Sequence, residues 1–83
     1  MAQYILMCRS MTVAQRAVNT LTRAGFFAAL TKAPQSANPE GCTYGAKIAA
    51  RNLRSALELL HRTGLPVLKI LETEGTEVRE VHV

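Results

Sequence analysis

A ten-residue stretch, Ala33–Cys42, interrupts an otherwise regular chain and limits the folds that are open to it. It holds two prolines, a glycine, a serine and an asparagine, which favour turns and loops over helices and strands. The chain is thereby divided into two halves, and each half shows the pattern of a strand, a helix and a second strand. With 83 residues in total, the two halves form one domain. Functional residues concentrate on loops that a rigid scaffold holds, so Cys42 at the end of this loop is the first candidate for chemistry.

The first half begins with Gln3–Cys8, a short apolar run that predicts a strand covered on both sides. A helix is expected next, because apolar residues recur at helical spacing and Gly25 follows as a left-handed helix terminator. Ser10 or Thr12 is suited to cap the start of this helix. Phe26–Lys32 is predicted to form the second strand. The expected inner stripe of the helix comprises Ala14, Ala17, Val18, Leu21 and Ala24.

The second half repeats this pattern. Thr43–Ala49 alternates between apolar and polar residues, as a half-buried strand does. Asn52 is expected to cap a second helix, Gly64 to end it, and Pro66–Leu71 to form the fourth strand. Glu72–Val83 is left open between an edge strand and a tail in solvent. The side chains expected to face inward are Tyr44, Ala46 and Ile48 on the strand, and Leu53, Ala56, Leu57 and Leu60 on the helix.

This order of elements predicts an α+β fold, the ferredoxin-like βαββαβ sandwich, with both helices on one face of an antiparallel sheet. Right-handed crossovers give the strand order 4-1-3-2. The domain is expected over residues 1–73, with residues 74–83 as a C-terminal tail or an extra edge strand. The open face of the first strand would then carry either Ile5 and Met7 or Tyr4, Leu6 and Cys8. Exposed apolar side chains of this kind usually mark an interface, so a homo-oligomer is expected.

Composition narrows the setting in which the protein works. No apolar run approaches the roughly 18 residues that a membrane span needs, and the N-terminus lacks the pattern of a secretory signal. A soluble cytoplasmic protein with reduced cysteines is therefore expected. Residues 1–71 carry a net charge of +7 and residues 72–83 a net charge of −3, which gives the overall +4. The basic part favours anionic partners, either acidic proteins or other anions.

The predicted topology brings the two cysteines together. The end of the first strand, Cys8 and Arg9, should lie near the start of the third, Cys42 and Thr43, within or close to disulfide distance. The start of the first helix, at Ser10, lies at the same end of the sheet. Its partial positive charge, together with Arg9 or Lys32, would favour the thiolate form of Cys42 and lower its pKa. Cys8 itself also fits the role of a small core residue.

The chain resembles a small bacterial family of selenium/sulfur-carrier-like proteins from Tyr4 to about Leu71. The shared features are a strand ending near Ser10, a helix ending in Ala24-Gly25, a proline-containing loop closing on Cys42, and a helix ending in Thr63-Gly64. The family commonly has glycine directly after the cysteine; here Gly41 precedes Cys42 and Thr43 follows it. The resemblance implies a carrier whose Cys42 holds sulfur or selenium as a persulfide-type adduct, received from a desulfurase-type donor protein. No cofactor and no metal are expected.

Two other kinds of ligand, a copper ion and RNA, are alternatives to carried sulfur or selenium. Met7, Cys8 and Met11 are soft ligands that would suit Cu(I), but Met7 and Cys8 should point to opposite faces of their strand. A basic domain of this fold could also bind RNA, with Tyr44-Gly45-Ala46 as a faint resemblance to the RNA-binding strand. Tyr44 is expected to face the helices, however, and the aromatic residues are too few for a stacking platform. Neither a metal nor nucleic acid is favoured.

Hydrolytic catalysis has little support in the sequence. There is no aspartate, and neither His61 nor His82 can be placed beside a nucleophile. A carrier or a binding protein is therefore favoured over an enzyme. The alternative to the carrier is a non-catalytic interaction module, which would bind a protein partner through its open sheet face and in which Cys42 would play no part.

Overall fold

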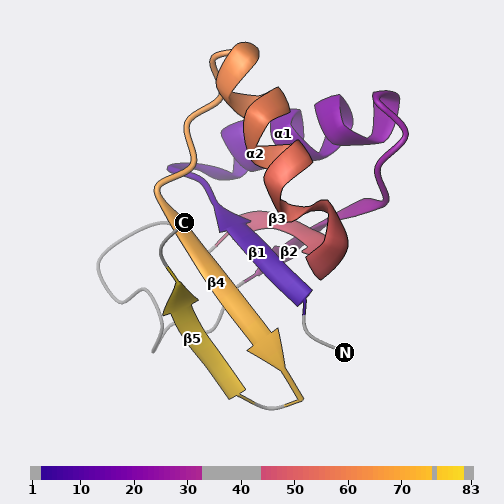
Figure 1. Cartoon of the computed structure of the whole chain (residues 1–83). Helices are drawn as coiled ribbons and strands as arrows, with labels where there is room; N and C mark the ends of the chain where they lie inside the picture. The colour runs from indigo at the N-terminus through magenta and orange to yellow at the C-terminus, as the bar shows by residue number, and fades with distance from the viewer. Residues whose placement is uncertain (1–2, 33–43, 76, 82–83) are drawn as a thin grey trace.

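The computed structural model describes residues 3–32, 44–75 and 77–81. Five strands form one antiparallel sheet with the order β2-β3-β1-β4-β5, and both helices cover the same face of it (Figure 1). The order expected for the first four strands is therefore the one observed. The elements along the chain are β1 (Gln3–Met7), α1 (Met11–Arg23), β2 (Ala28–Lys32), β3 (Tyr44–Ala49), the 3-10 turn η2 (Ala50–Asn52), α2 (Leu53–Arg62), β4 (Lys69–Glu74) and β5 (Glu77–Val81).

Both helices end as the sequence predicts. Gly25 and Gly64 have φ values of 92° and 75°, the left-handed region that glycine enters without a Cβ penalty. After each glycine, the next backbone N–H donates to the carbonyl five residues back, as in a Schellman motif; for Phe26 and Leu65 these bonds are 2.9 Å long. The two glycines therefore set the length of both helices.

The two helices begin differently. Ser10 is the residue that caps α1: its Oγ accepts a hydrogen bond of 3.2 Å from the backbone N–H of Val13. Asn52 holds the N-cap position of α2, as predicted, but its side chain makes no cap hydrogen bond. Asn52 has helical backbone angles, φ −97° and ψ 0°, and not the extended conformation that lets a cap side chain fold back onto the first turn. The turn η2 leads the chain into α2 in its place.

The main core lies between the sheet and the helix layer. The predicted inner stripe of α1 is buried there except for Ala24, which is exposed at the end of the helix. Tyr44 packs against this core, as expected from the alternation of β3. The buried members of the cluster are Leu6, Cys8, Ala14, Ala17, Val18, Leu21, Ala46, Ile48, Ala56 and Leu60.

The opposite face of the sheet differs from the prediction. Ile5 and Met7 point to this face but are only 4% and 1% exposed, and with Leu71 they form a second buried cluster. Val78 of β5 packs against that cluster, and the Ile5 side chain lies over Gly45 of β3. The exposed apolar face expected on β1 is therefore absent, and with it the argument from which a homo-oligomer was predicted.

The C-terminal part of the sheet is shifted and longer than expected. The fourth strand was placed at Pro66–Leu71 but runs from Lys69 to Glu74, because β1 pairs with this later stretch, with Gln3 opposite Thr73 and Met7 opposite Lys69. The sequence left open whether the C-terminal residues form an edge strand or a tail. Glu77–Val81 forms an edge strand, β5, which pairs antiparallel with β4. Neither helix in the described residues is long and apolar enough to cross a membrane.

Candidate functional site

The end of β1, the start of β3 and the end of β2 meet at one end of the sheet. The backbone N–H of Cys8 donates to the carbonyl oxygen of Tyr44 at 3.2 Å. Lys32, the last residue of β2, lies opposite Tyr44 in the β2–β3 register. Ser10, the N-cap residue of α1, follows two residues after Cys8. The prediction that the first and third strands join at this end is confirmed.

Cys8 is a core residue. Its side chain is 1% exposed and lies in the helix-facing cluster with Leu6 and Ala14. The Cys8 thiol donates to the carbonyl oxygen of Leu6 at 3.5 Å. A partner protein cannot reach a sulfur so placed while the fold is intact. The structure thus assigns Cys8 to packing and not to contact with a partner.

The other predicted site residues divide into two groups. Arg9 and Lys32 are exposed at the end of the sheet just described, and Ser10 is taken up by capping α1. The remaining three, Gly41, Cys42 and Thr43, lie outside the described residues. The proximity of Cys8 and Cys42 and the thiolate character of Cys42 therefore stay predictions.

Both alternative ligand classes fit the structure poorly. Met7 and Cys8 lie in different buried clusters on opposite faces of the sheet, so they do not form a joint sulfur site. Residues 3–32, 44–75 and 77–81 contain no group of three or more His, Cys, Asp or Glu side chains that could hold a metal ion. Tyr44 packs against the helix-facing core and presents no open ring for base stacking.

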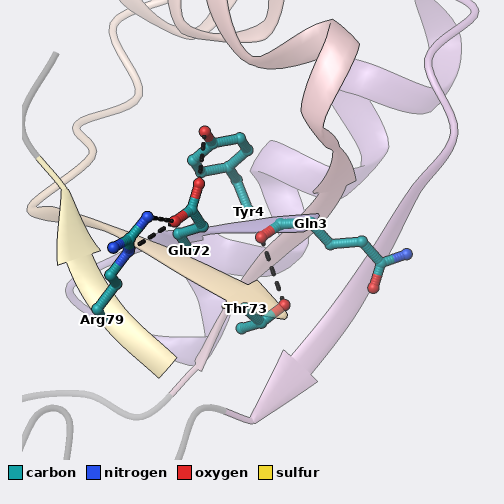
Figure 2. A network of polar contacts seen from close by, with 5 residues as sticks. All are labelled: Gln3, Tyr4, Glu72, Thr73 and Arg79. Carbon is teal, nitrogen blue, oxygen red and sulfur yellow. Dashed lines mark hydrogen bonds and ion pairs between the residues drawn. The ribbon is translucent and has the colours of Figure 1, made fainter. Parts of the chain in front are cut away.

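A polar network that the sequence analysis missed crosses three strands (Figure 2). Tyr4 of β1 lies opposite Glu72 of β4, and Glu72 lies opposite Arg79 of β5. The Tyr4 hydroxyl donates to Glu72 Oε2 at 3.1 Å, while Arg79 Nε donates to Glu72 Oε1 at 2.6 Å. On the other face, Thr73 Oγ1 donates to the carbonyl oxygen of Gln3 at 3.3 Å. Together these bonds tie the edge hairpin to the central strand.

The network shifts the acidity of its members. The hydrogen bond from Arg79, followed by that from Tyr4, holds the pKa of Glu72 below its ordinary value. The hydrogen bond to Glu72 raises the pKa of Tyr4, because loss of the proton would remove the bond and place two negative charges together. A signal for this arrangement exists in the sequence: Gly75 between two alternating stretches indicates a hairpin, which sets Glu72 opposite Arg79.

Arg79→Gln should raise the pKa of Glu72 toward the ordinary glutamate value of about 4.3, because it removes the larger of the two causes of the shift. Since the folded-state pKa is lowered, the stabilisation that Glu72 provides is present above the unfolded pKa and is lost as the pH falls through the folded pKa. Stability of the variant should therefore match the wild type at strongly acidic pH and fall below it toward neutrality.

An NMR titration of the Glu72 carboxyl carbon measures this directly. Tyr4→Phe should raise the same pKa by less, and Lys32→Gln, which removes a charge from β2 on the opposite edge of the sheet, should leave it unchanged. An equal pKa in wild type and Arg79→Gln would contradict the assignment of Arg79 as the main cause.

Comparison with known proteins places the chain in a family but beside no characterised relative. A family model described as "Putative Se/S carrier protein-like" matches residues 3–72, which runs from the start of β1 into β4 and leaves out the end of β4 and all of β5. No curated protein and no solved structure matches the chain. The matched range contains both cysteines, residues 33–43 between β2 and β3, and the end of the sheet where Cys8 meets Tyr44. On this match over most of its length, the chain belongs to the Se/S carrier protein-like family.

Proposed function

We propose that the protein is a sulfur or selenium carrier in which Cys42 accepts the transferred atom from a donor protein. The observation that carries the proposal is the family match over residues 3–72. The burial of Cys8 supports it by elimination. The chain has two cysteines, and a carrier must present its sulfur to a partner, which Cys8 at 1% exposure does not do.

The proposed chemistry is a transfer between persulfides. The Cys42 thiolate attacks the outer sulfur of a persulfide on the donor, which is a desulfurase-type protein. A sulfur–sulfur bond forms on Cys42 as the bond in the donor breaks, and the donor cysteine leaves as a thiolate. One persulfide is consumed and one is formed, so no outside oxidant or reductant takes part. Selenium would follow the same course as the outer atom.

Three positive features favour a thiolate near the start of β3. Cys42 precedes Tyr44 by two residues, and Tyr44 lies opposite Lys32 and accepts the Cys8 hydrogen bond. Arg9 is exposed beside Cys8. The N-terminus of α1, capped by Ser10, adds partial positive charge at the same end of the sheet. Cations and helix N-termini lower thiol pKa values, and the thiolate is the form that attacks.

The finer architecture belongs to the same proposal. Residues 1–73 form a ferredoxin-like unit, and residues 74–83 extend it with the edge strand β5. The protein works in the cytoplasm, where reduced thiols persist. The alternative, an interaction module that binds through its open sheet face, loses its main support, because Ile5, Met7 and Leu71 are buried on that face.

The test is intact-mass spectrometry after incubation with a cysteine desulfurase and cysteine or selenocysteine. The wild type should gain about 32 mass units for sulfur or about 79 for selenium, and a reducing agent should remove the gain. Cys42→Ala should lose the gain, and Cys8→Ala should keep it.

Two outcomes would remove the proposal. One is the absence of any adduct on the wild type. The other is equal loading of Cys42 and of a cysteine introduced at an exposed position elsewhere, such as Ser55→Cys on α2, which would mean that exposure alone accounts for the adduct.

A further inference from the structure

A polar groove lies on the outer surface of α1, beside the chain that leaves α2. It has a volume of about 310 Å³. Within residues 3–32, 44–75 and 77–81, no acidic and no aromatic side chain lines it. Its walls are Arg16, Asn19, Thr20, Arg23, Thr63 and Leu65.

The spacing of the α1 residues explains why they form one wall. Positions 16, 19, 20 and 23 follow the i, i+3, i+4, i+7 pattern, so they lie along one side of the helix. Positions 14, 17, 18 and 21 form the neighbouring stripe, which is buried against the sheet. Arg16 and Arg23 are seven positions apart, which corresponds to about 10.5 Å along the helix at about 1.5 Å per residue. The groove therefore presents two exposed guanidinium groups at its ends.

The groove presents hydrogen-bond donors to an incoming ligand. Gln15 Nε2 donates to Asn19 Oδ1 at 3.2 Å, which orients the Asn19 amide and leaves its N–H groups for another acceptor. Thr63 Oγ1 lies 3.1 Å from the carbonyl oxygens of Leu59 and Leu60, so its proton is already used. The side-chain donors that the groove offers to a ligand come from Arg16, Arg23, Asn19 and Thr20.

Neither ion pair found among the described residues involves a side chain of the groove. The two ion pairs among the described residues, Lys69–Glu80 and Glu72–Arg79, both lie in the β4–β5 hairpin. Four of the six acidic residues of the chain belong to that hairpin, whose turn lies at the far end of the molecule from the helix layer (Figure 1). The acidic hairpin of the same chain is therefore not placed to neutralise Arg16 and Arg23.

We infer that this groove docks a carboxylate-rich segment of a partner protein. Carboxylates match the guanidinium groups in charge and in hydrogen-bond geometry, and the net charge of +4 draws an acidic partner toward the chain. Single-stranded nucleic acid fits less well, because such sites combine cations with aromatic side chains for stacking, and the groove has none. The inference rests on the groove alone and holds whether or not Cys42 carries sulfur or selenium.

The experiment measures binding of a fluorescein-labelled ten-residue peptide of alternating Glu and Ser by fluorescence anisotropy. The full-length protein should bind it more tightly than the matching Lys-Ser peptide, and added salt should weaken binding. The double variant R16Q/R23Q should weaken binding at least fivefold. The matched double variant R51Q/R54Q loses the same two charges at the start of α2, away from the groove, and should weaken binding less than twofold. The Asn19 side-chain amide should shift in NMR spectra on titration.

Three results would overturn the inference. The first is no binding of the Glu-Ser peptide at low salt. The second is equal weakening by the two double variants, which would mean that net charge alone attracts the peptide. The third is tighter binding of a ten-nucleotide single-stranded RNA that R16Q/R23Q abolishes, which would make the groove a nucleic-acid site. None of these results bears on the mass adduct at Cys42, so the two proposals fail separately.

Discussion

In the native protein, the Cys8 thiol should react with iodoacetamide at least about a thousandfold more slowly than in the unfolded chain. The reason is its burial at 1% exposure between β1 and α1, with the thiol donating to the Leu6 carbonyl oxygen. A thiol in such a position reacts only when the structure opens, and even a stability near the low end of the usual range, about 5 kcal/mol, makes the open state rarer than one molecule in a thousand.

The measurement uses the Cys42→Ala variant, so that Cys8 is the one cysteine present. The alkylation rate of Cys8 without denaturant is compared with its rate in about 6 M guanidinium chloride, which unfolds most domains. A native rate within tenfold of the unfolded rate would mean that this end of the sheet opens readily. Cys8 would then become accessible to a donor protein, and the elimination that points to Cys42 would no longer hold.

The elements with strong local signals were predictable from the sequence. The first helix follows from its apolar stripe and its terminal glycine, and both Gly25 and Gly64 adopt the left-handed conformation that the prediction needed. The meeting of Cys8 with the start of β3 also followed, because the order of strands and helices leaves few topologies once crossovers are right-handed. The apolar, two-sided character of β1 correctly indicated a central strand.

The position of the fourth strand was predicted wrongly because its pairing with β1, far away in the sequence, sets where the strand lies. Pro66–Leu71 is the more apolar stretch, but the strand is Lys69–Glu74. This strand includes charged residues, Lys69 and Glu72, that pair with side chains of neighbouring strands. Glu72 fits into the sheet because Tyr4 and Arg79 satisfy its carboxylate from the strands on either side. Such a register depends on contacts about seventy residues apart in the sequence, which no local pattern reports.

The burial of the second face was missed for a similar reason. One set of β1 side chains, either Ile5 and Met7 or Tyr4, Leu6 and Cys8, was expected to be exposed, since a four-stranded sheet with both helices on one side leaves the other side open. The fifth strand contributes Val78 to that side, and Gly45 lets the Ile5 side chain lie flat on β3. A glycine within an alternating strand indicates that another chain segment approaches its backbone closely. At Gly45 that segment is β1, so a larger residue there should lower the stability of the fold.

Gly45→Ala should destabilise the protein by about 2–3 kcal/mol, as overpacking of a tight contact does. A Cβ at this position would lie 2.8 Å from Ile5 Cγ2 and 2.8 Å from the backbone oxygen of Leu6, closer than van der Waals contact permits. The side chain of Ile5 could move, but the Leu6 carbonyl belongs to the central strand β1. Relief would therefore require β3 to shift away from β1, along which its residues are paired from Gln3 to Met7.

Thermal unfolding followed by circular dichroism provides the measurement, with an expected fall in Tm of about 10–15 °C for a domain of this size. Ala29→Ser, at an exposed position of the neighbouring strand β2, serves as the control and should change Tm little. Adding Ile5→Ala to Gly45→Ala separates the two contacts: it removes Cγ2 but leaves the Leu6 oxygen in place. The double variant should therefore remain at least as unstable as Gly45→Ala. Full recovery would show that the side chain of Ile5, and not the backbone of β1, sets the requirement for glycine.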